Sequence, residues 1–547
     1  MRDTFLQQLC RLAKDEPDKT LDLAACRGLV SDLCCQLTSD GESSDSLCKQ
    51  KGMRIVGQDT LVDRTVMSLL MNEHLLLEGL PGVAKTQTVK FLAQDTGMIS
   101  LRVQFFPDMQ PSDLVGKTTF DVRALHKATD ASVGAHAQEA DVEHWHNGPL
   151  FCNLLVADEI NRAPSKVQAA LLEAMGEIQI TPLGHTAHVI RSDREWEMWL
   201  RHFRGLEAAG AIEGDLWGSL AETVGRLPVE KMDARALRPA VRALNSQRFD
   251  RFGGNSPFRW DARRADPAPL FGASAIHLAR KDDAQLTVFA TQNPIEQAGT
   301  YPMSEAQVDR FNMKHTVRFP DYDAMFPIAW MINRPQEKED PDDAYNLPPE
   351  RELTAEDRAR KDLALRASLY FFRRCRELMY GPPGRPRQGA LGDLIQASEH
   401  DLHSPAGKIM RIVFYTHLKM SRTARPSEAE SLLADPEQQQ RMRFLFGRPE
   451  VRDDLTMLSR NDAFEYVNSG ASPRGWMGMA RACLAHAFLR GNGAKLNIDD
   501  GDIRAVAEDV LGHRIRLNSQ ARVRDLTQAK LLKVVMNTVL GNGNAHA

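Results

Sequence analysis

The feature that most constrains this chain is a glycine-bearing segment, GLPGVAKT, at Gly79–Thr86. It directly follows HLLLEG (74–79), an apolar run typical of a buried parallel strand. Loops of this kind bind phosphate because their backbone N–H groups and the positive end of the next helix face the anion. In its context of strand, loop and helix, the segment predicts a P-loop nucleotide site in an α/β fold with a parallel, helix-covered sheet.

Two residues of this loop have expected chemical roles. Lys85 is expected to neutralise the β- and γ-phosphates, and the Thr86 hydroxyl to ligate Mg²⁺. The general pattern has glycine where Ala84 stands, but the added methyl group is small, so we interpret the segment as a variant of a working loop. The residues expected to contact ATP are Gly79, Pro81, Gly82, Val83, Ala84, Lys85, Thr86 and Gln87.

A second apolar run, NLLVADE (153–159), ends in two carboxylates. Open α/β sheets bind ligands at the carboxyl ends of their strands. Asp158 is therefore expected to help hold Mg²⁺ beside the nucleotide, and Glu159 to orient and deprotonate the attacking water. The alternative is that both carboxylates only cap the next helix. A third run, QLTVFATQN (285–293), ends in Asn293, which can hydrogen-bond that water or the γ-phosphate.

Longer segments carry a resemblance to a known family. ADEINRAPSKVQAALLEAMGE (157–177) and TQNPIEQAGTYPMSEAQVDRF (291–311) resemble the signature segments of the MoxR family of AAA+ ATPases. GASPRGWMGMARACLAHAFLRG (470–491) and VLGHRIRL (510–517) resemble the lid of that family. The resemblance implies an AAA+ α/β ATPase core, an all-α lid and a ring of subunits, typically six, with ATP at each subunit interface.

The resemblance also implies roles for single residues. Val56, Gly57 and Gln58 match a segment that lies near the adenine in relatives. Asn293 matches sensor 1, Arg474 matches sensor 2, and Arg310 matches the arginine finger that reaches a neighbour's nucleotide. For Arg310 the alternative is a salt bridge at a helix end. Relatives with an extra lid helix use the sensor 2 arginine across the interface, so the sequence leaves open whether Arg474 acts in cis or in trans.

Composition changes along the chain suggest three parts. Residues 1–50 are expected to form an N-terminal helical extension and linker, 51–335 the ATPase core, and 336–547 a helical lid and C-terminal region. The core contains a large departure from the family, a mainly helical insertion at 191–272. We expect this insertion to emerge between the arms of a hairpin formed by GEIQITPLGHTAHVI and SAIHLARKDDAQLTV.

Within the insertion, 248–264 interleaves arginines with aromatic residues. Such a stretch can stack bases, bind an acidic protein or fold into the core of the insertion itself. A first enlarged hairpin, at 120–147, contains His126, His136, His144 and His146. HWH (144–146) puts two imidazoles on one face of a strand, but nothing else in the sequence supports a metal site there.

The remaining composition is that of a soluble enzyme. The net charge of −4 provides no overall attraction to nucleic acid or anionic membranes. No window of the sequence approaches a membrane span, and the first residues lack the apolar core of a signal peptide. The eight scattered cysteines are expected to be free thiols. We therefore expect a cytoplasmic protein.

The leading functional hypothesis follows from the family. MoxR relatives remodel or mature other proteins, often with a partner that carries a von Willebrand factor A (VWA) domain. A nucleic-acid-dependent motor is the first alternative, and salt-sensitive stimulation of hydrolysis by DNA or RNA would favour it. An ATP-gated ring scaffold is the second, although Glu159, Asn293 and Arg310 argue against it. The sequence identifies neither the protein client nor the ligand of the insertion.

Overall fold

The structure is a computed structural model, and its described residues leave several gaps. They are 4–15, 21–38, 55–80, 82–120, 143–150, 152–177, 179–180, 187–188, 286–293, 301–325, 328, 355–382, 388–417, 448–459, 466–491 and 496–541. The expected insertion at 191–272 and Pro81 of the phosphate loop lie outside these residues.

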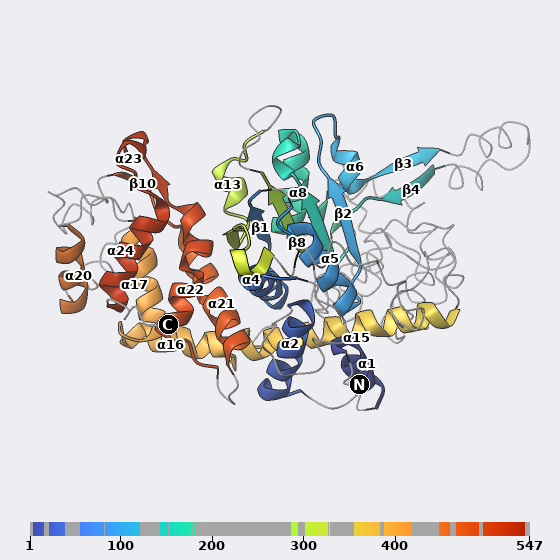
Figure 1. The fold of residues 1–547 in the computed structure, drawn as a ribbon, viewed down its shortest axis with the longest axis horizontal. Helices are drawn as coiled ribbons and strands as arrows, with labels where there is room; N and C mark the ends of the chain where they lie inside the picture. The colour runs from blue at the N-terminus through green and yellow to red at the C-terminus, as the bar shows by residue number, and fades with distance from the viewer. Residues whose placement is uncertain are drawn as a thin grey trace, which may run out of the picture.

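A five-stranded parallel sheet organises the first half of the chain (Figure 1). Alternate residues of its central strands face opposite sides, because Leu75 and Leu77 belong to one apolar cluster and Leu76 to another. Helices therefore have to cover both faces of the sheet. The strand order is β2 (Ser100–Gln104), β5 (Leu154–Asp158), β8 (Thr287–Gln292), β1 (Leu75–Glu78) and β9 (Met313–Thr316). The helices around it are α4 (Asp59–Met71), α5 (Lys85–Thr96), α6 (Pro111–Val115), α8 (Ser165–Glu177) and α13 (Glu305–Val308).

Two short antiparallel hairpins leave this core. In the first, β3 (Gly116–Phe120) pairs with β4 (Glu143–Asn147), as expected for the hairpin around 120–147. In the second, β6 (Gln179–Ile180) pairs with β7 (Ala187–His188). Both β6 and β7 come from GEIQITPLGHTAHVI, the segment expected to be a single arm, so this segment pairs with itself. Residues 273–285, which carry most of the second expected arm, lie outside the described residues, so the place where the insertion emerges stays a prediction.

The second half of the described chain is helical. The long helix α15 (Ala355–Tyr380) runs beneath the core and leads to the lid helices at the left of Figure 1. These are α16 (Ala390–His400), α17 (Pro405–His417), α20 (Pro449–Ser459), α21 (Pro473–Arg490), α22 (Asp500–Leu511), η8 (Gly512–Arg514), α23 (Ser519–Val523) and α24 (Gln528–Leu540). A small ribbon, β10 (Val467–Ser469) with β11 (Arg516–Leu517), ties two lid segments together.

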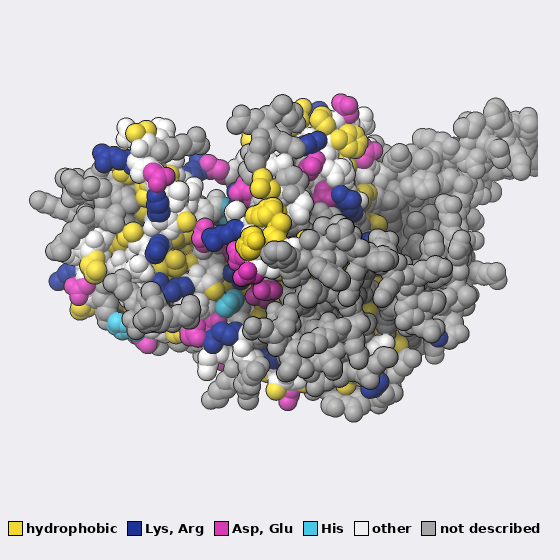
Figure 2. Space-filling view, in the orientation of Figure 1, with side chains coloured by type: hydrophobic (Ala, Val, Ile, Leu, Met, Phe, Trp, Pro, Cys, Tyr) yellow, Lys and Arg dark blue, Asp and Glu magenta, His cyan; other side chains and the backbone are white. Residues whose placement is uncertain are grey.

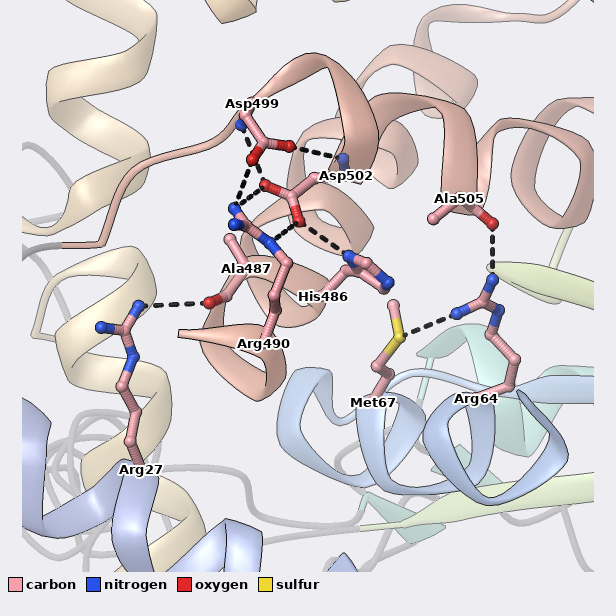
Figure 3. A network of polar contacts seen from close by, with 9 residues as sticks. All are labelled: Arg27, Arg64, Met67, His486, Ala487, Arg490, Asp499, Asp502 and Ala505. Atoms are coloured by element: carbon pink, nitrogen blue, oxygen red, sulfur yellow. Dashed lines mark hydrogen bonds and ion pairs between the residues drawn. The ribbon is translucent and has the colours of Figure 1, made fainter. Parts of the chain in front are cut away.

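The N-terminal helices α1 (Phe5–Asp15) and α2 (Leu23–Leu37) pack onto this framework. Phe5 of α1 meets Phe371 of α15 edge-on, with ring centroids 5.4 Å apart, and both side chains are fully buried. Arg27 of α2 donates to the carbonyl oxygen of Ala487 near the end of α21, at 3.2 Å (Figure 3). The N-terminal extension therefore contacts both α15 and the lid.

The lid meets the core through buried charges. Arg64 of α4 donates to Asp509 of α22 at 2.5 Å, and the His315 ring of β9 lies 3.0 Å from the same carboxylate. Burial alone would raise the pKa of Asp509, but the hydrogen bond from His315 and the Arg64 charge hold that pKa below its ordinary value. Figure 2 shows basic and acidic side chains along the boundary between lid and core.

Candidate nucleotide site

The phosphate loop begins where β1 ends. Gly79 has a φ of +158°, and a Cβ atom there would lie 2.7 Å from the carbonyl oxygen of Val317, which follows β9. No side chain fits at this position, so the first glycine allows the loop to leave the sheet. Lys85 opens α5, and its ammonium group donates to the Gly79 carbonyl oxygen. Burial lowers the pKa of Lys85, while Asp158, Glu159 and Glu78 oppose that shift.

At position 84, alanine differs from the glycine of the loop pattern mainly in the backbone conformation that it tolerates, not in side-chain volume. It has a φ of +61° and a ψ of 12°, the left-handed region in which the β-carbon of an L-residue is crowded. Glycine adopts this conformation without that penalty. The loop therefore holds Ala84 in a strained backbone conformation directly before Lys85.

Asp158 lies at the end of β5, among hydroxyl groups from two other elements. Thr86 and Thr291 each donate to its Oδ1 at 3.0 Å, and Arg102 of β2 donates to its Oδ2 at 2.6 Å. The Asp158 side chain is only 6 % exposed. A carboxylate and a hydroxyl are the hard oxygen ligands that Mg²⁺ prefers, and they lie together beside the phosphate loop. Thr86 and Asp158 therefore fit the expected magnesium site.

Glu159 follows Asp158 in a left-handed conformation, with a φ of +57°. Two groups hold the same carboxylate oxygen, Oε2: the Gln104 side-chain amide at 2.8 Å and the Arg162 guanidinium at 3.0 Å. The Glu159 backbone N–H donates to the Thr291 hydroxyl at 3.0 Å. No side-chain capping bond joins Glu159 to the short helix that follows, so the structure does not support the alternative that it only caps a helix. Strained residues of this kind cluster at functional sites.

Asn293 and Gln58 lie, like the phosphate loop, beside the carboxyl ends of the parallel strands. Asn293 follows β8, whose last residue, Gln292, accepts a hydrogen bond from the Gly79 backbone N–H at 3.4 Å. Gln58, in the segment expected near the adenine, is buried and donates to the Arg318 carbonyl oxygen beyond β9 at 2.9 Å. The carboxyl ends of β1, β5 and β8 thus bring the loop, the acidic pair and Asn293 to one edge of the sheet.

Arg310 lies at the opposite edge of the sheet, where the amino-terminal ends of the parallel strands lie. It precedes β9, and the register pairs Met313 of β9 with Leu75, the first residue of β1, whereas Gly79 follows the end of β1. The length of β1 separates the two edges by about 10 Å, at roughly 3.3 Å per residue. The Arg310 guanidinium donates to the Leu172 carbonyl oxygen of α8, and a Cβ atom at Gly176 would lie 2.6 Å from that guanidinium. Among the described residues, the hydrogen-bond partner of the Arg310 side chain is thus a backbone carbonyl oxygen of α8.

Arg474 lies beside Arg310 in the fold. It stands in the first turn of α21, is 70 % exposed, and pairs with Asp309 at 3.6 Å. Asp309 directly precedes Arg310, so both arginines belong to the edge remote from the phosphate loop of the same chain. This geometry favours the trans alternative for Arg474, which the sequence left open.

Three residues at the site were missed by the sequence argument. Arg102 and Gln104 alternate along β2, which puts both side chains on the face that meets Asp158 and Glu159. That period-two pattern was readable in SLRVQ (100–104). Thr291 bridges the two carboxylate residues from β8, and nothing in its local sequence distinguishes it from a strand threonine.

Among the described residues, no group of three or more His, Cys, Asp or Glu side chains is arranged to hold a metal ion. Of the hairpin histidines, His126 and His136 lie outside the described residues. None of the described helices has the length and apolar character needed to cross a bilayer.

Fold and site together define a P-loop ATPase of the AAA+ class. Comparison with known proteins agrees. A model of the "ATPase family associated with various cellular activities (AAA)" matches residues 74–192 and 275–313, and a model of the "AAA lid domain" matches 461–533. A crystallised protein of Cytophaga hutchinsonii with an ATPase designation shares the fold, with a TM-score of 0.50 and 21% identity over 96% of this chain and 98% of that one.

Two proteins with similar sequences carry the name MoxR. The chain is 26% identical to the chaperone MoxR1 of Mycobacterium tuberculosis over 494 residues, which cover 89% of this chain and 78% of that protein. It is 30% identical to the protein MoxR of Methylorubrum extorquens over 127 residues, 23% of this chain and 34% of that one. Together these matches support a MoxR-family AAA+ ATPase.

Proposed function

We propose that this ATPase works as a ring in which Arg310 of one subunit completes the ATP site of the next. The observation that supports this is the position of Arg310 at the edge of the sheet opposite the phosphate loop of its own chain. An arginine at that edge is better placed to reach ATP bound to a neighbouring subunit than ATP bound to its own chain. Arginines of this kind stabilise charge on the transferring phosphoryl group and contribute about 10³- to 10⁵-fold in rate elsewhere.

Mixing two inactive variants tests the shared site. Lys85→Ala removes the charge that faces the phosphates and should not bind ATP, whereas Arg310→Ala should bind ATP and not hydrolyse it. In a mixed ring, an Arg310→Ala site beside a Lys85→Ala subunit has both a working loop and a finger. Hydrolysis should therefore return on mixing under conditions that exchange subunits. Mixtures that stay inactive after proven exchange would overturn the trans arrangement.

We further propose that the ring remodels or matures a protein client, with a VWA-domain protein as partner. The support is the chaperone designation of the M. tuberculosis relative and the family resemblance. Glu159→Gln is expected to hold ATP and prolong the client-bound state. Affinity capture with Glu159→Gln should therefore enrich a protein that is absent with Lys85→Ala, which cannot load nucleotide. Equal recovery with both variants would remove the support for an ATP-loaded client complex.

A further inference from the structure

A buried residue of the lid, Arg514, binds the turn that carries Arg310. This turn, residues 309–312 between α13 and β9, is called the finger turn below. Arg514 ends η8, directly after α22, and its side chain is only 4 % exposed. The lid thus extends a charged group into the core at the place where the finger begins.

The Arg514 guanidinium binds the finger turn on both sides of Arg310. Its Nε donates to the Asp309 carboxylate at 2.8 Å. Its Nη2 donates to the Phe311 carbonyl oxygen at 2.9 Å, and its Nη1 donates to the Asn312 carbonyl oxygen at 3.0 Å. Three nitrogen atoms of one planar group therefore fix the backbone that flanks the finger.

Two more lid residues contact the same turn. The His513 ring nitrogen Nε2 lies 3.2 Å from the Phe311 carbonyl oxygen, and Arg474 pairs with Asp309 at 3.6 Å. Within the described residues, the Arg310 side chain itself contacts α8 of the core, not the lid. The backbone around Arg310 therefore depends on the lid, although the finger turn belongs to the core in sequence.

We propose that Arg514 is a positioning residue for the arginine finger, through which the lid of one subunit controls hydrolysis in the neighbouring subunit's site. This inference rests on the proposed trans role of Arg310. Arg514 is buried within its own chain and bound to the finger turn, so it acts through Arg310. A displacement of about 1 Å in a catalytic group can cost about 100-fold in rate, so a loosened turn should impair turnover without impairing ATP binding.

Arg514→Lys is the most direct test. Lysine keeps the positive charge but has no planar fork, so it cannot hold the carboxylate and two carbonyl oxygens together. We expect kcat to fall about 10- to 100-fold, while the affinity for a fluorescent ATP analogue stays within about threefold of the wild type. In mixed rings, Lys85→Ala should restore hydrolysis to Arg514→Lys because it supplies an intact finger. Arg310→Ala should not, because both subunits then lack a working finger.

A matched control is Arg64→Lys. Arg64 is also a buried arginine at the boundary between lid and core, and it binds Asp509 of the neighbouring α22 without touching the finger turn. Arg64→Lys and Arg514→Lys should lower the melting temperature by similar amounts. In Arg64→Lys, however, kcat should stay within about threefold of the wild type. An equal loss of kcat in both variants would show that the finger turn has no special dependence on Arg514 and would overturn the proposal.

Asp309→Ala provides a second variant if Arg514→Lys does not assemble. It removes the carboxylate that anchors Arg514 and keeps the carbonyl contacts, so we expect a smaller loss of kcat with the same rescue by Lys85→Ala. The two proposals fail separately. If Arg310→Ala is not rescued by Lys85→Ala, the trans finger is wrong. If that rescue works but the Arg514→Lys and Asp309→Ala variants hydrolyse ATP normally, only the positioning role is wrong.

Discussion

The side-chain amide of Gln104 donates a 2.8 Å hydrogen bond to the carboxylate of Glu159, across 55 residues of sequence. Arg162 shares the same carboxylate oxygen. This pair of donors fixes the direction in which the proposed general base faces.

Replacing Gln104 by alanine should lower kcat for ATP hydrolysis about tenfold and leave ATP affinity unchanged. The reason is that a general base contributes about 10² to 10⁴ in rate only while it is held in reach of its proton. Steady-state hydrolysis and equilibrium binding of a fluorescent nucleotide separate the two effects. Gln104→Glu is the harsher comparison, because it puts a second carboxylate beside Glu159. An unchanged kcat in Gln104→Ala would mean that Arg162 alone orients the base.

Glu159→Gln should retain ATP binding while turnover falls by about two to four orders of magnitude. The amide keeps the size and most hydrogen bonds of the carboxylate but cannot accept a proton. Single-turnover hydrolysis with the variant in excess over ATP is the appropriate measurement. Hydrolysis near the wild-type rate would exclude Glu159 as the general base.

Arg102→Ala should reduce the Mg²⁺ concentration needed for half-maximal nucleotide binding by about threefold. Arg102 occupies Oδ2 of Asp158 at 2.6 Å, so its guanidinium competes with a cation for that carboxylate. The effect is expected to be modest because the Arg102 side chain is 61 % exposed and water screens its charge. A Mg²⁺ titration of bound fluorescent ADP measures it, with Arg102→Lys as the charge-retaining control. A Mg²⁺ requirement that rises in Arg102→Ala would show that Arg102 supports the metal site.

Ala84→Gly should leave ATP binding and hydrolysis intact and should not lower stability. Glycine removes a left-handed strain of about 1–2 kcal/mol, which offsets the larger entropy of the unfolded chain. Ala84→Val, by contrast, places a β-branched side chain at a φ of +61° and should weaken nucleotide binding at least tenfold. Binding assays and melting curves of both variants provide the check. Wild-type binding by Ala84→Val would contradict the loop conformation.

Asp502→Asn should destabilise the lid by about 2 kcal/mol at pH 7. Although burial opposes it, hydrogen bonds from His486 and Arg490 hold the pKa of Asp502 at about 2, below its ordinary 3.8 (Figure 3). A carboxyl whose pKa is lowered on folding stabilises the fold above about pH 4, and that contribution disappears as the pH falls towards 2.

We therefore expect the free energy of unfolding, measured by chemical denaturation, to fall less between pH 7 and pH 2 in Asp502→Asn than in the wild type. Asp499→Asn is the matched control, because Asp499 is 53 % exposed in the same network and should have a much smaller effect. Parallel pH profiles for Asp502→Asn and the wild type would contradict the assigned pKa.

Local patterns were sufficient for the ATPase core. The apolar strands before Gly79, Asp158 and Asn293 were each readable as short continuous runs, and the structure aligns them as neighbouring parallel strands. Their carboxyl ends had to meet because parallel strands share one edge. The hairpin that precedes β8 in the chain differs from the expectation, because β6 and β7 both come from one expected arm.

The sequence by itself therefore determined the chemistry of this protein: a phosphate loop, an acidic pair and a polar residue at three strand ends. Only the tertiary structure decided which side chains hold those groups in place. Gln104 at Glu159, Arg102 at Asp158 and Arg514 at the finger turn join elements that lie 55, 56 and about 200 residues apart. Such pairings depend on which strands lie side by side and on how the lid packs against the core. A local pattern such as the alternation in SLRVQ (100–104) shows which residues share a face, but it does not identify their partners.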